Sequence, residues 1–193
     1  MKQSIRNVGY IPITETGKAI SYGDIIYFAT AEAGGREYSS TPKGDIQKEY
    51  ANGELAFSVD NNAGYDIDLT LLDLIDDVEK NWYGKELVTG DYKGVAEYAD
   101  SKELPKFALI IHEDTTDGVG KISFYPYCQV SSRTSKSGKT KEEGAFDFAF
   151  AQHKIIASPR PTDQLVCFEF AGTEKLTAAP EPKAQSQDEG AEG

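Results

Sequence analysis

The feature that most constrains the fold is a two-residue alternation of apolar and polar side chains. Between residues 121 and 130, Ile122 and Phe124 fall on one face of an extended chain and Ser123 on the other. The same alternation occurs in residues 65–71, 145–151 and 165–170, and more weakly in residues 5–13, 24–31, 54–59, 92–98 and 107–113. Side chains alternate in this way along half-buried β-strands. We therefore expect a mainly β fold, a sandwich or barrel of about eight to ten strands.

Residues 73–83 follow a helical period instead. The apolar positions of this segment recur three and four residues apart and are Leu74, Ile75, Val78 and Trp82. Asp73 suits the N-cap of a helix, and Gly84 suits its stop. We expect one short flanking helix of about ten residues that packs its apolar face on the sheet.

Pro126 lies inside the clearest strand pattern of the chain. Proline has no amide hydrogen, so it cannot donate to a strand ladder. The strand that contains Pro126 should therefore lie at a sheet edge or carry a bulge at this position.

Three segments carry little apolar content. Residues 33–53 contain Gly34-Gly35, Thr41-Pro42 and Asn52-Gly53, and we expect a long loop or mobile hairpin between early strands. Residues 131–144 form a second polar stretch that is locally basic. After Ala171 the chain turns to Pro, Ala, Glu and Gln. We expect a β domain over residues 1–172 and an acidic, disordered tail over residues 173–193.

The chain is acidic, with a formal net charge of −12 over 193 residues. Five acids and two lysines beyond residue 173 account for −3, which leaves −9 for the β domain. This balance argues against a protein that grips nucleic acid, because phosphate neutralisation needs an excess of Lys and Arg. No secretory signal or membrane span is recognisable, and the two cysteines, Cys128 and Cys167, read as small buried thiols of a cytosolic protein.

No segment has the spacing of a catalytic, cofactor-binding or metal-binding motif. Gly138-Lys139-Thr140 lacks the upstream glycine of a phosphate-binding loop. Residues 60–71 begin like a calcium loop but lack its central glycine and final glutamate, so a hairpin turn explains Asn61, Asn62 and Gly64 better. A hydrolase that uses His112 or His153 is the least supported hypothesis. We expect no catalytic residue, no cofactor and no metal.

Six segments, in this order and spacing, carry a resemblance to a known family. They are Asn7-Val8-Gly9-Tyr10-Ile11-Pro12, Asn62-Ala63-Gly64-Tyr65-Asp66-Ile67, Phe107-Ala108-Leu109-Ile110-Ile111-His112-Glu113, Tyr125-Pro126-Tyr127-Cys128, Lys139-Thr140-Lys141-Glu142 and Ala157-Ser158-Pro159-Arg160-Pro161-Thr162-Asp163. Over residues 4–170 the chain resembles the major tail protein family of long, non-contractile-tailed bacteriophages of Gram-positive hosts. The Ser-Pro-Arg-Pro stretch after a Phe-rich run is the most specific part of the match.

The resemblance implies a structural, non-enzymatic virion protein that is assembled in the host cytoplasm. It implies hexameric rings that stack into the tail tube, together with three partners: tape measure, tail terminator and distal tail proteins. DNA would pass through the lumen without specific binding, and no membrane would be involved. The segments implied to reach neighbouring copies are residues 33–53 and residues 2–7. Together with the basic loop, they give these candidate assembly contacts: Asn7, Tyr10, Arg36, Tyr38, Lys43, Lys48, Tyr50, Arg133, Lys136, Lys139 and Lys141.

Two alternatives stay open from the sequence. The basic loop either contacts acidic surfaces of an adjacent ring or is simply solvated. The 11 tyrosines and one tryptophan also suit a monomeric carbohydrate- or surface-binding β-sandwich module, since aromatic faces stack on sugars. If the chain forms a tail tube, the acidity of the chain predicts a lumen that repels DNA phosphates and lets the genome slide.

Overall fold

A computed structural model describes residues 4–51, 54–100, 102–134 and 150–183. These residues form thirteen strands and two helices. The elements are β1 (Ser4–Thr16), β2 (Ala19–Tyr22), β3 (Ile26–Tyr27), α1 (Thr30–Ala33), β4 (Gly35–Lys43), β5 (Ile46–Ala51), β6 (Glu54–Asp60), β7 (Gly64–Leu71), α2 (Asp76–Tyr83), β8 (Glu86–Val88), β9 (Gly94–Ala96), β10 (Phe107–Asp114), β11 (Lys121–Val130), β12 (Ala151–Ala157) and β13 (Phe168–Ala171).

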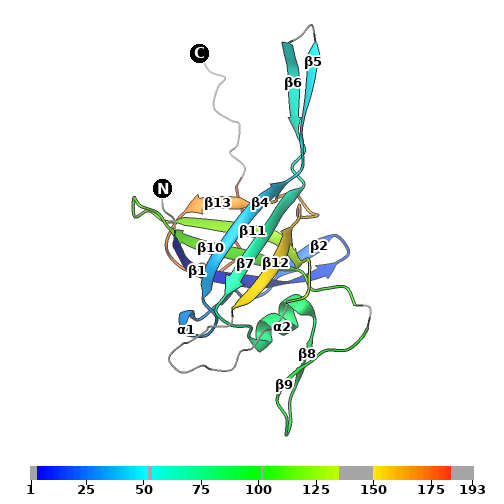
Figure 1. The fold of residues 1–193 in the computed structure, drawn as a ribbon, viewed down its shortest axis with the longest axis vertical. Helices are drawn as coiled ribbons and strands as arrows, with labels where there is room; N and C mark the ends of the chain where they lie inside the picture. Colours follow the sequence, from blue (N-terminus) through cyan, green and yellow to red (C-terminus); the bar gives the residue numbers. More distant parts are fainter. Residues whose placement is uncertain (1–3, 52–53, 101, 135–149, 184–193) are drawn as a thin grey trace, which may run out of the picture.

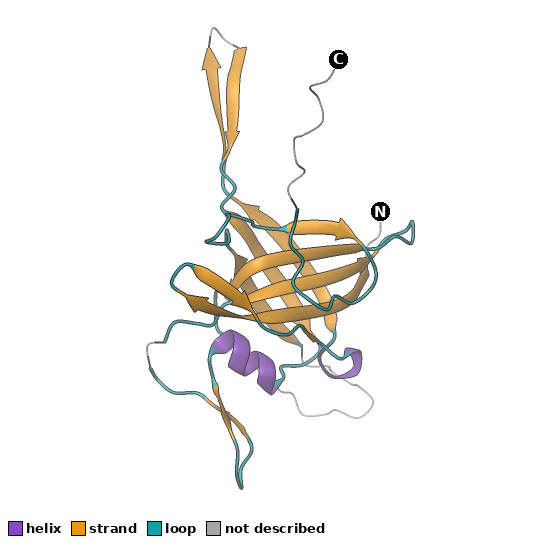
Figure 2. Cartoon of the chain, turned by 180° about the vertical axis from the view of Figure 1, so that it is seen from behind, coloured by secondary structure: helices purple, strands orange, loops and turns teal. Residues whose placement is uncertain are grey.

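One nine-stranded antiparallel sheet builds the body, which confirms the expected mainly β fold. Its main path runs β2-β1-β10-β11-β12-β7-β4, with β13 paired to β11 and β3 paired to β1. The sheet bends on itself, so that β4, β7 and β12 cross β1, β10 and β11 as a second layer (Figures 1 and 2). β11 joins the layers, because its first half pairs with β13 and its last residues pair with β12.

The bulge expected at Pro126 is present. Phe107 lies opposite Cys128 and Leu109 lies opposite Tyr125, so two steps along β10 match three along β11. The extra residue removes the need for a donor at the proline.

The main core lies between the two layers and is capped by α2. Its largest fully buried side chains include Trp82, Tyr10, Phe107, Leu69 and Leu71. The prediction of an apolar helix face is confirmed, since Val78 and Trp82 are fully buried. The predicted start is wrong: α2 begins at Asp76, and Asp73 instead accepts a hydrogen bond from the amide of Leu74.

The predicted helix stop is confirmed at Gly84. This residue has φ +67°, in the left-handed region that glycine tolerates best. Its amide donates to the carbonyl of Lys80, and the amide of Lys85 donates to the carbonyl of Glu79. Two carbonyl groups at the end of the helix receive hydrogen bonds in this way.

A second apolar cluster covers the outer face of the layer formed by β1, β10 and β11. Ile11, Ile110 and Phe124 are fully buried there, although they lie on the face of the sheet away from the main core. The chain after β13 provides part of the cover, because Leu176 and Ala179 pack against this cluster. The prediction of a disordered tail is therefore wrong for residues 173–183, while residues 184–193 lie outside the described residues.

Residues 33–51, the described part of the expected long loop over residues 33–53, are not a long loop, which corrects the first of the two alternatives for that segment. β4 pairs with β7 inside the sheet, and β5 pairs with β6 beyond it. Together they form one long hairpin whose distal part, β5–β6, projects from the body as an arm (Figure 1). Gly44 lies at the junction with φ +110°, and a Cβ there would lie 1.7 Å from the carbonyl oxygen of Asn61.

Three further expectations from the sequence differ from the fold. Residues 61–63 link β6 to β7 halfway along the long hairpin and do not close it. Residues 24–31 hold only the two-residue β3 and the start of α1. The strand count of eight to ten is too low, because β2, β4, β5, β8 and β12 were not expected as strands. The pattern expected over residues 145–149 lies outside the described residues.

Within the described ranges, no helix is long or apolar enough to cross a membrane.

Candidate assembly surfaces

The β5–β6 arm exposes large apolar side chains. Ile46 is 61% exposed, Tyr50 64% and Val59 53%. Ile46 pairs with Asp60 while Val59 pairs with Gln47, so Ile46 and Val59 lie on opposite faces of the hairpin. An isolated two-stranded hairpin is marginal in water without a covered face. The arm therefore presents apolar side chains that the described residues leave uncovered.

A second hairpin, β8–β9, projects from the opposite end of the molecule (Figures 1 and 2). Leu87, Val88 and Tyr92 are exposed on it, and Tyr98, just after β9, is 57% exposed. A cavity of about 430 Å³ lies at its base, between α2 and the chain after β11. This hairpin was not among the expected contacts. The signal available was the pair Leu87-Val88 and Tyr92 on the two sides of the turn residues Gly90 and Asp91.

The structure divides the expected contact residues among different surroundings. Lys48 and Tyr50 are exposed on the arm. Arg36 lies over the ring of Phe150, with its guanidinium carbon 3.7 Å from the ring centroid. The ammonium of Lys43 is half-buried and 3.5 Å from the carboxylate of Asp66.

One expected contact is contradicted by the structure. Tyr10 is fully buried, because its ring packs against Phe28 and Trp82, and its hydroxyl accepts a hydrogen bond from Asn81. A reaching N-terminal arm is wrong for the described residues 4–7, since they form the start of β1, and Asn7 is paired with His112. The apolar–polar alternation of residues 5–13 predicted this strand, whereas the resemblance implied a contact arm over residues 2–7.

The basic loop is described only at its beginning. Arg133 is exposed and its guanidinium lies 3.4 Å from the carboxylate of Glu97, at the base of the β8–β9 hairpin. Lys136, Lys139 and Lys141 lie outside the described residues. Arg133 and the β5–β6 arm are therefore at opposite ends of the molecule.

Both histidines are interior. His112 Nε2 lies 3.0 Å from the hydroxyl of Tyr27, and His153 Nδ1 lies 2.7 Å from the hydroxyl of Tyr83. Neither histidine lines the 430 Å³ cavity. Within the described ranges, no three His, Cys, Asp or Glu side chains gather as a metal site.

The burial of His153 predicts a titration well below neutrality. Burial lowers the pKa of His153 to about 4, whereas an unfolded histidine titrates near 6.5. The unfolded state therefore takes up the proton first, and His153 lowers stability progressively as the pH falls from about 6.5 to about 4. We expect NMR to show a neutral His153 at pH 5, and His153→Gln to lose this part of the pH dependence. An imidazole that titrates near pH 6.5 in the folded protein would contradict the burial.

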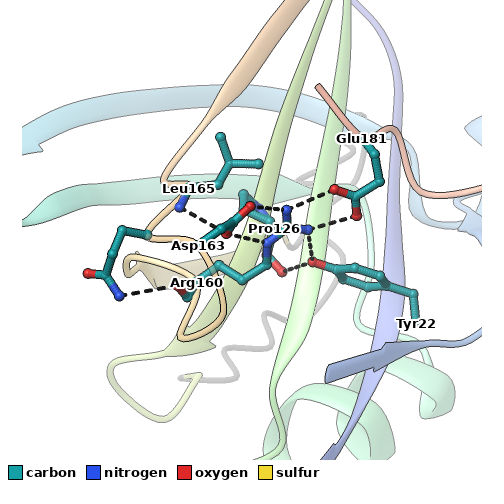
Figure 3. A network of polar contacts seen from close by, with 7 residues as sticks. Tyr22, Pro126, Arg160, Asp163, Leu165 and Glu181 are labelled. Atoms are coloured by element: carbon teal, nitrogen blue, oxygen red, sulfur yellow. Dashed lines mark hydrogen bonds and ion pairs between the residues drawn. The ribbon is translucent and has the colours of Figure 1, made fainter. Parts of the chain in front are cut away.

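Arg160, from the Ser-Pro-Arg-Pro segment, ties the chain after β13 to the body (Figure 3). Its side chain is 5% exposed and makes paired bonds to two carboxylates: Nε and Nη2 to Asp163, and Nη1 and Nη2 to Glu181, at 2.6–2.8 Å. Nη1 also donates to the hydroxyl of Tyr22, which donates in turn to the carbonyl of Pro126. Such paired geometry fixes position as well as charge.

A second contact holds the same segment, which we call the C-terminal strap (residues 172–183). The amide of Leu176 donates to the hydroxyl of Tyr27 at 2.8 Å, and the ammonium of Lys175 lies 5.2 Å from the centroid of the Tyr27 ring. The strap therefore has one polar anchor at Glu181, another at Leu176, and apolar contacts with the second cluster.

The Arg160 network predicts the behaviour of Asp163 in acid. Hydrogen bonds from Arg160 lower the pKa of Asp163 to about 2, from an ordinary value of 3.8. A lowered pKa in the folded state means that the stabilisation is complete above about pH 4 and is lost as the pH falls towards 2. In Arg160→Gln, we expect the Asp163 carboxyl to titrate near its ordinary value and the strap amides to lose protection from hydrogen exchange.

Carbon-detected NMR titration of Asp163 measures the first effect, and exchange of the Leu176 amide measures the second. Lys43→Gln is the control, because it removes one side of another ion pair, Lys43–Asp66, that involves no residue of the strap. Unchanged protection of Leu176 in Arg160→Gln would show that the strap is held without this anchor.

A scan of the chain against protein-family models and a search of curated proteins both find no match.

Proposed function

We propose that this chain is a structural, non-enzymatic major tail protein of a long-tailed, non-contractile bacteriophage. In this proposal, copies assemble in the host cytoplasm into hexameric rings that stack as the tail tube of the virion and meet tape measure, tail terminator and distal tail proteins. The resemblance of residues 4–170 supplies the family, and the mainly β fold is compatible with it.

The β5–β6 arm is the observation that carries the proposal. It extends the β4–β7 hairpin beyond the sheet and exposes Ile46, Tyr50 and Val59, which this chain alone leaves uncovered. A stack of rings needs contacts between different surfaces on its two ends, because like surfaces close into pairs. The arm and the β8–β9 hairpin at the opposite pole supply two such different surfaces.

The negative charge of the chain supports the proposal that DNA passes through the tube without binding to its wall. The net charge of −12 opposes tight binding of DNA phosphates, and an acidic wall would let DNA slide. An assembled tube whose inner wall is net positive would refute this part of the proposal.

Sedimentation of the purified full chain over a range of concentrations tests self-assembly directly. We expect hexamers and larger species whose share rises with concentration. A single monomeric species at every concentration, with the fold intact by circular dichroism, would count against spontaneous assembly.

The cavity at the base of the β8–β9 hairpin favours one second candidate, a carbohydrate- or surface-binding module. Tyr83 and Tyr98 line this cavity together with Lys102 and Arg133, and aromatic rings beside polar groups are typical of sugar sites. This candidate predicts a monomer whose Tyr98→Ala variant loses sugar binding on a glycan array. Assembly that is unaffected by Tyr98→Ala, with no glycan bound, would exclude it.

A further inference from the structure

The seam where the bent sheet fails to close contains a groove. β4 ends the main path of the sheet, and no strand pairing joins it to β1 in the described residues. The two strands nevertheless approach closely, since a Cβ at Gly35 would lie 2.3 Å from a methyl group of Val8. A groove of about 670 Å³ runs along this seam, with Ile5 of β1, Tyr38 and Ser40 of β4, and Glu113 of β10 in its lining.

Glu113 Oε2 is a buried carboxylate oxygen for which the described residues provide no hydrogen-bond donor. Glu113 itself is only 4% exposed. A buried carboxylate oxygen in this state carries the full cost of losing its water. A donor that enters the groove would remove that cost.

Basic side chains near Glu113 are engaged with other groups. Lys121 lies opposite Glu113 in the β10–β11 ladder, but its ammonium is 2.6 Å from the carboxylate of Glu169. Arg6 is paired with Asp114, and Arg36 lies over the ring of Phe150. Among the described residues, no basic side chain lies within ion-pair distance of Glu113.

Two hydroxyl groups complete the lining. Burial, and then a hydrogen bond to the Glu113 carboxylate and the charge of that carboxylate, raise the pKa of Tyr38, so that its phenol stays neutral beside the acid. Ser40 Oγ accepts a hydrogen bond from the hydroxyl of Tyr125 at 3.1 Å. A carboxylate and two hydroxyl oxygens offer acceptors in several directions, which suits the compact ammonium with three donors better than a flat guanidinium.

We propose that the groove between β1 and β4 binds a primary ammonium group, with the carboxylate of Glu113 as its counter-ion and Tyr38 and Ser40 as further acceptors. Two sources carry this chemistry: a free amine, or the lysine side chain of a second copy of this chain. The second source rests on the proposed self-assembly, whereas the site itself does not.

Titration of the full chain with ethylammonium chloride, followed by ¹⁵N NMR, tests the site on the unassembled protein. We expect shifts at Tyr38, Ser40 and Glu113 that saturate on the order of 1 mM or above, as suits so small a ligand. Sodium chloride at equal concentration should not produce them. Glu113→Gln, which keeps the shape of the side chain, should abolish the response, and Tyr38→Phe should weaken it several-fold.

Glu37→Gln is the matched control, because Glu37 is an exposed acid on the same groove. It removes the same charge and should leave the response intact. No response in the wild type, an equal response in Glu113→Gln, or a loss in Glu37→Gln as large as in Glu113→Gln would each overturn the proposal.

Zero-length carbodiimide coupling in a mixture of ¹⁴N and ¹⁵N copies distinguishes the sources. A Glu113–lysine link between differently labelled copies assigns the ammonium to a second copy. Saturable ethylammonium binding without such a link assigns it to a free amine, and both results support the site. A link confined to one copy would overturn an open site, because a lysine of the same chain would then fill the groove. Failure of assembly alone would leave the ethylammonium result unchanged.

Discussion

Trp82→Ala is expected to lower the free energy of unfolding by about 3–5 kcal/mol, because it empties the centre of the main core. Trp82 is fully buried and stacks on Phe107 with ring centroids 4.4 Å apart and planes at 2°. It also meets Tyr10 and Phe28 edge-on, with centroids 5.5 and 5.9 Å away. Its indole nitrogen has no hydrogen-bond partner among the described residues, so the loss there is one of packing.

Urea unfolding followed by circular dichroism measures this loss. Tyr92→Ala is the matched control, since Tyr92 is 89% exposed and its removal should change stability by less than about 0.5 kcal/mol. A cost below about 1 kcal/mol for Trp82→Ala would mean that α2 is not docked on the sheet as described.

A double variant of the arm, Ile46→Ser with Tyr50→Ser, is expected to abolish assembly while the body stays folded. Both side chains are more than 60% exposed on β5, so the monomer loses little packing and its stability should change by about 0.5 kcal/mol or less per site. In the double variant, a partner that covers β5 would lose most of the apolar contact area that this strand provides. Sedimentation measures the assembly, and thermal unfolding checks the fold.

Gln47→Ser is the control for the arm variant. It shortens an exposed polar side chain on the same strand without removing apolar area, and assembly should persist. Assembly by the double variant at the wild-type concentration would show that the arm is not the contact that the proposal requires.

Strands with a strict alternation could be found from the sequence. Residues 65–71 and 121–130 match β7 and β11 closely. The apolar face of β7 lies in the main core, and Ile122 and Phe124 of β11 lie in the second cluster. The helix face that ends at Trp82 was equally visible. At Pro126 the sequence predicted either an edge strand or a bulge, and β11 carries the bulge.

Other strands carry no such signal for physical reasons. β4 is an edge strand made of Gly, Ser, Thr, Pro and charged residues with a single aromatic residue, Tyr38, and its outer side needs no apolar residues. β12 turns Ala151, His153 and Ala157 inward, where two small residues and a polar ring hide the alternation. Local composition does not separate such strands from loops.

The strap and the seam depend on contacts between distant parts of the chain. Arg160 meets Glu181 and Tyr22, which lie 21 and 138 residues away in the sequence. Acidic composition therefore suggested disorder where one buried guanidinium holds the segment in place. The groove at Glu113 arises in the same way, from the approach of β1 and β4. Of the expected contacts that fall in the described residues, only Lys48 and Tyr50 lie on the arm, which the sequence had marked as a loop or hairpin.

Negative-stain electron microscopy of the purified full chain, alone and with a tail-tip assembly added as initiator, tests the tail-tube proposal most directly. We expect rings of six copies and stacked tubes with an open lumen, which disappear in the Ile46→Ser, Tyr50→Ser variant and persist in Gln47→Ser. Single, separate particles under both conditions, from protein that is folded by circular dichroism, would contradict the proposed function.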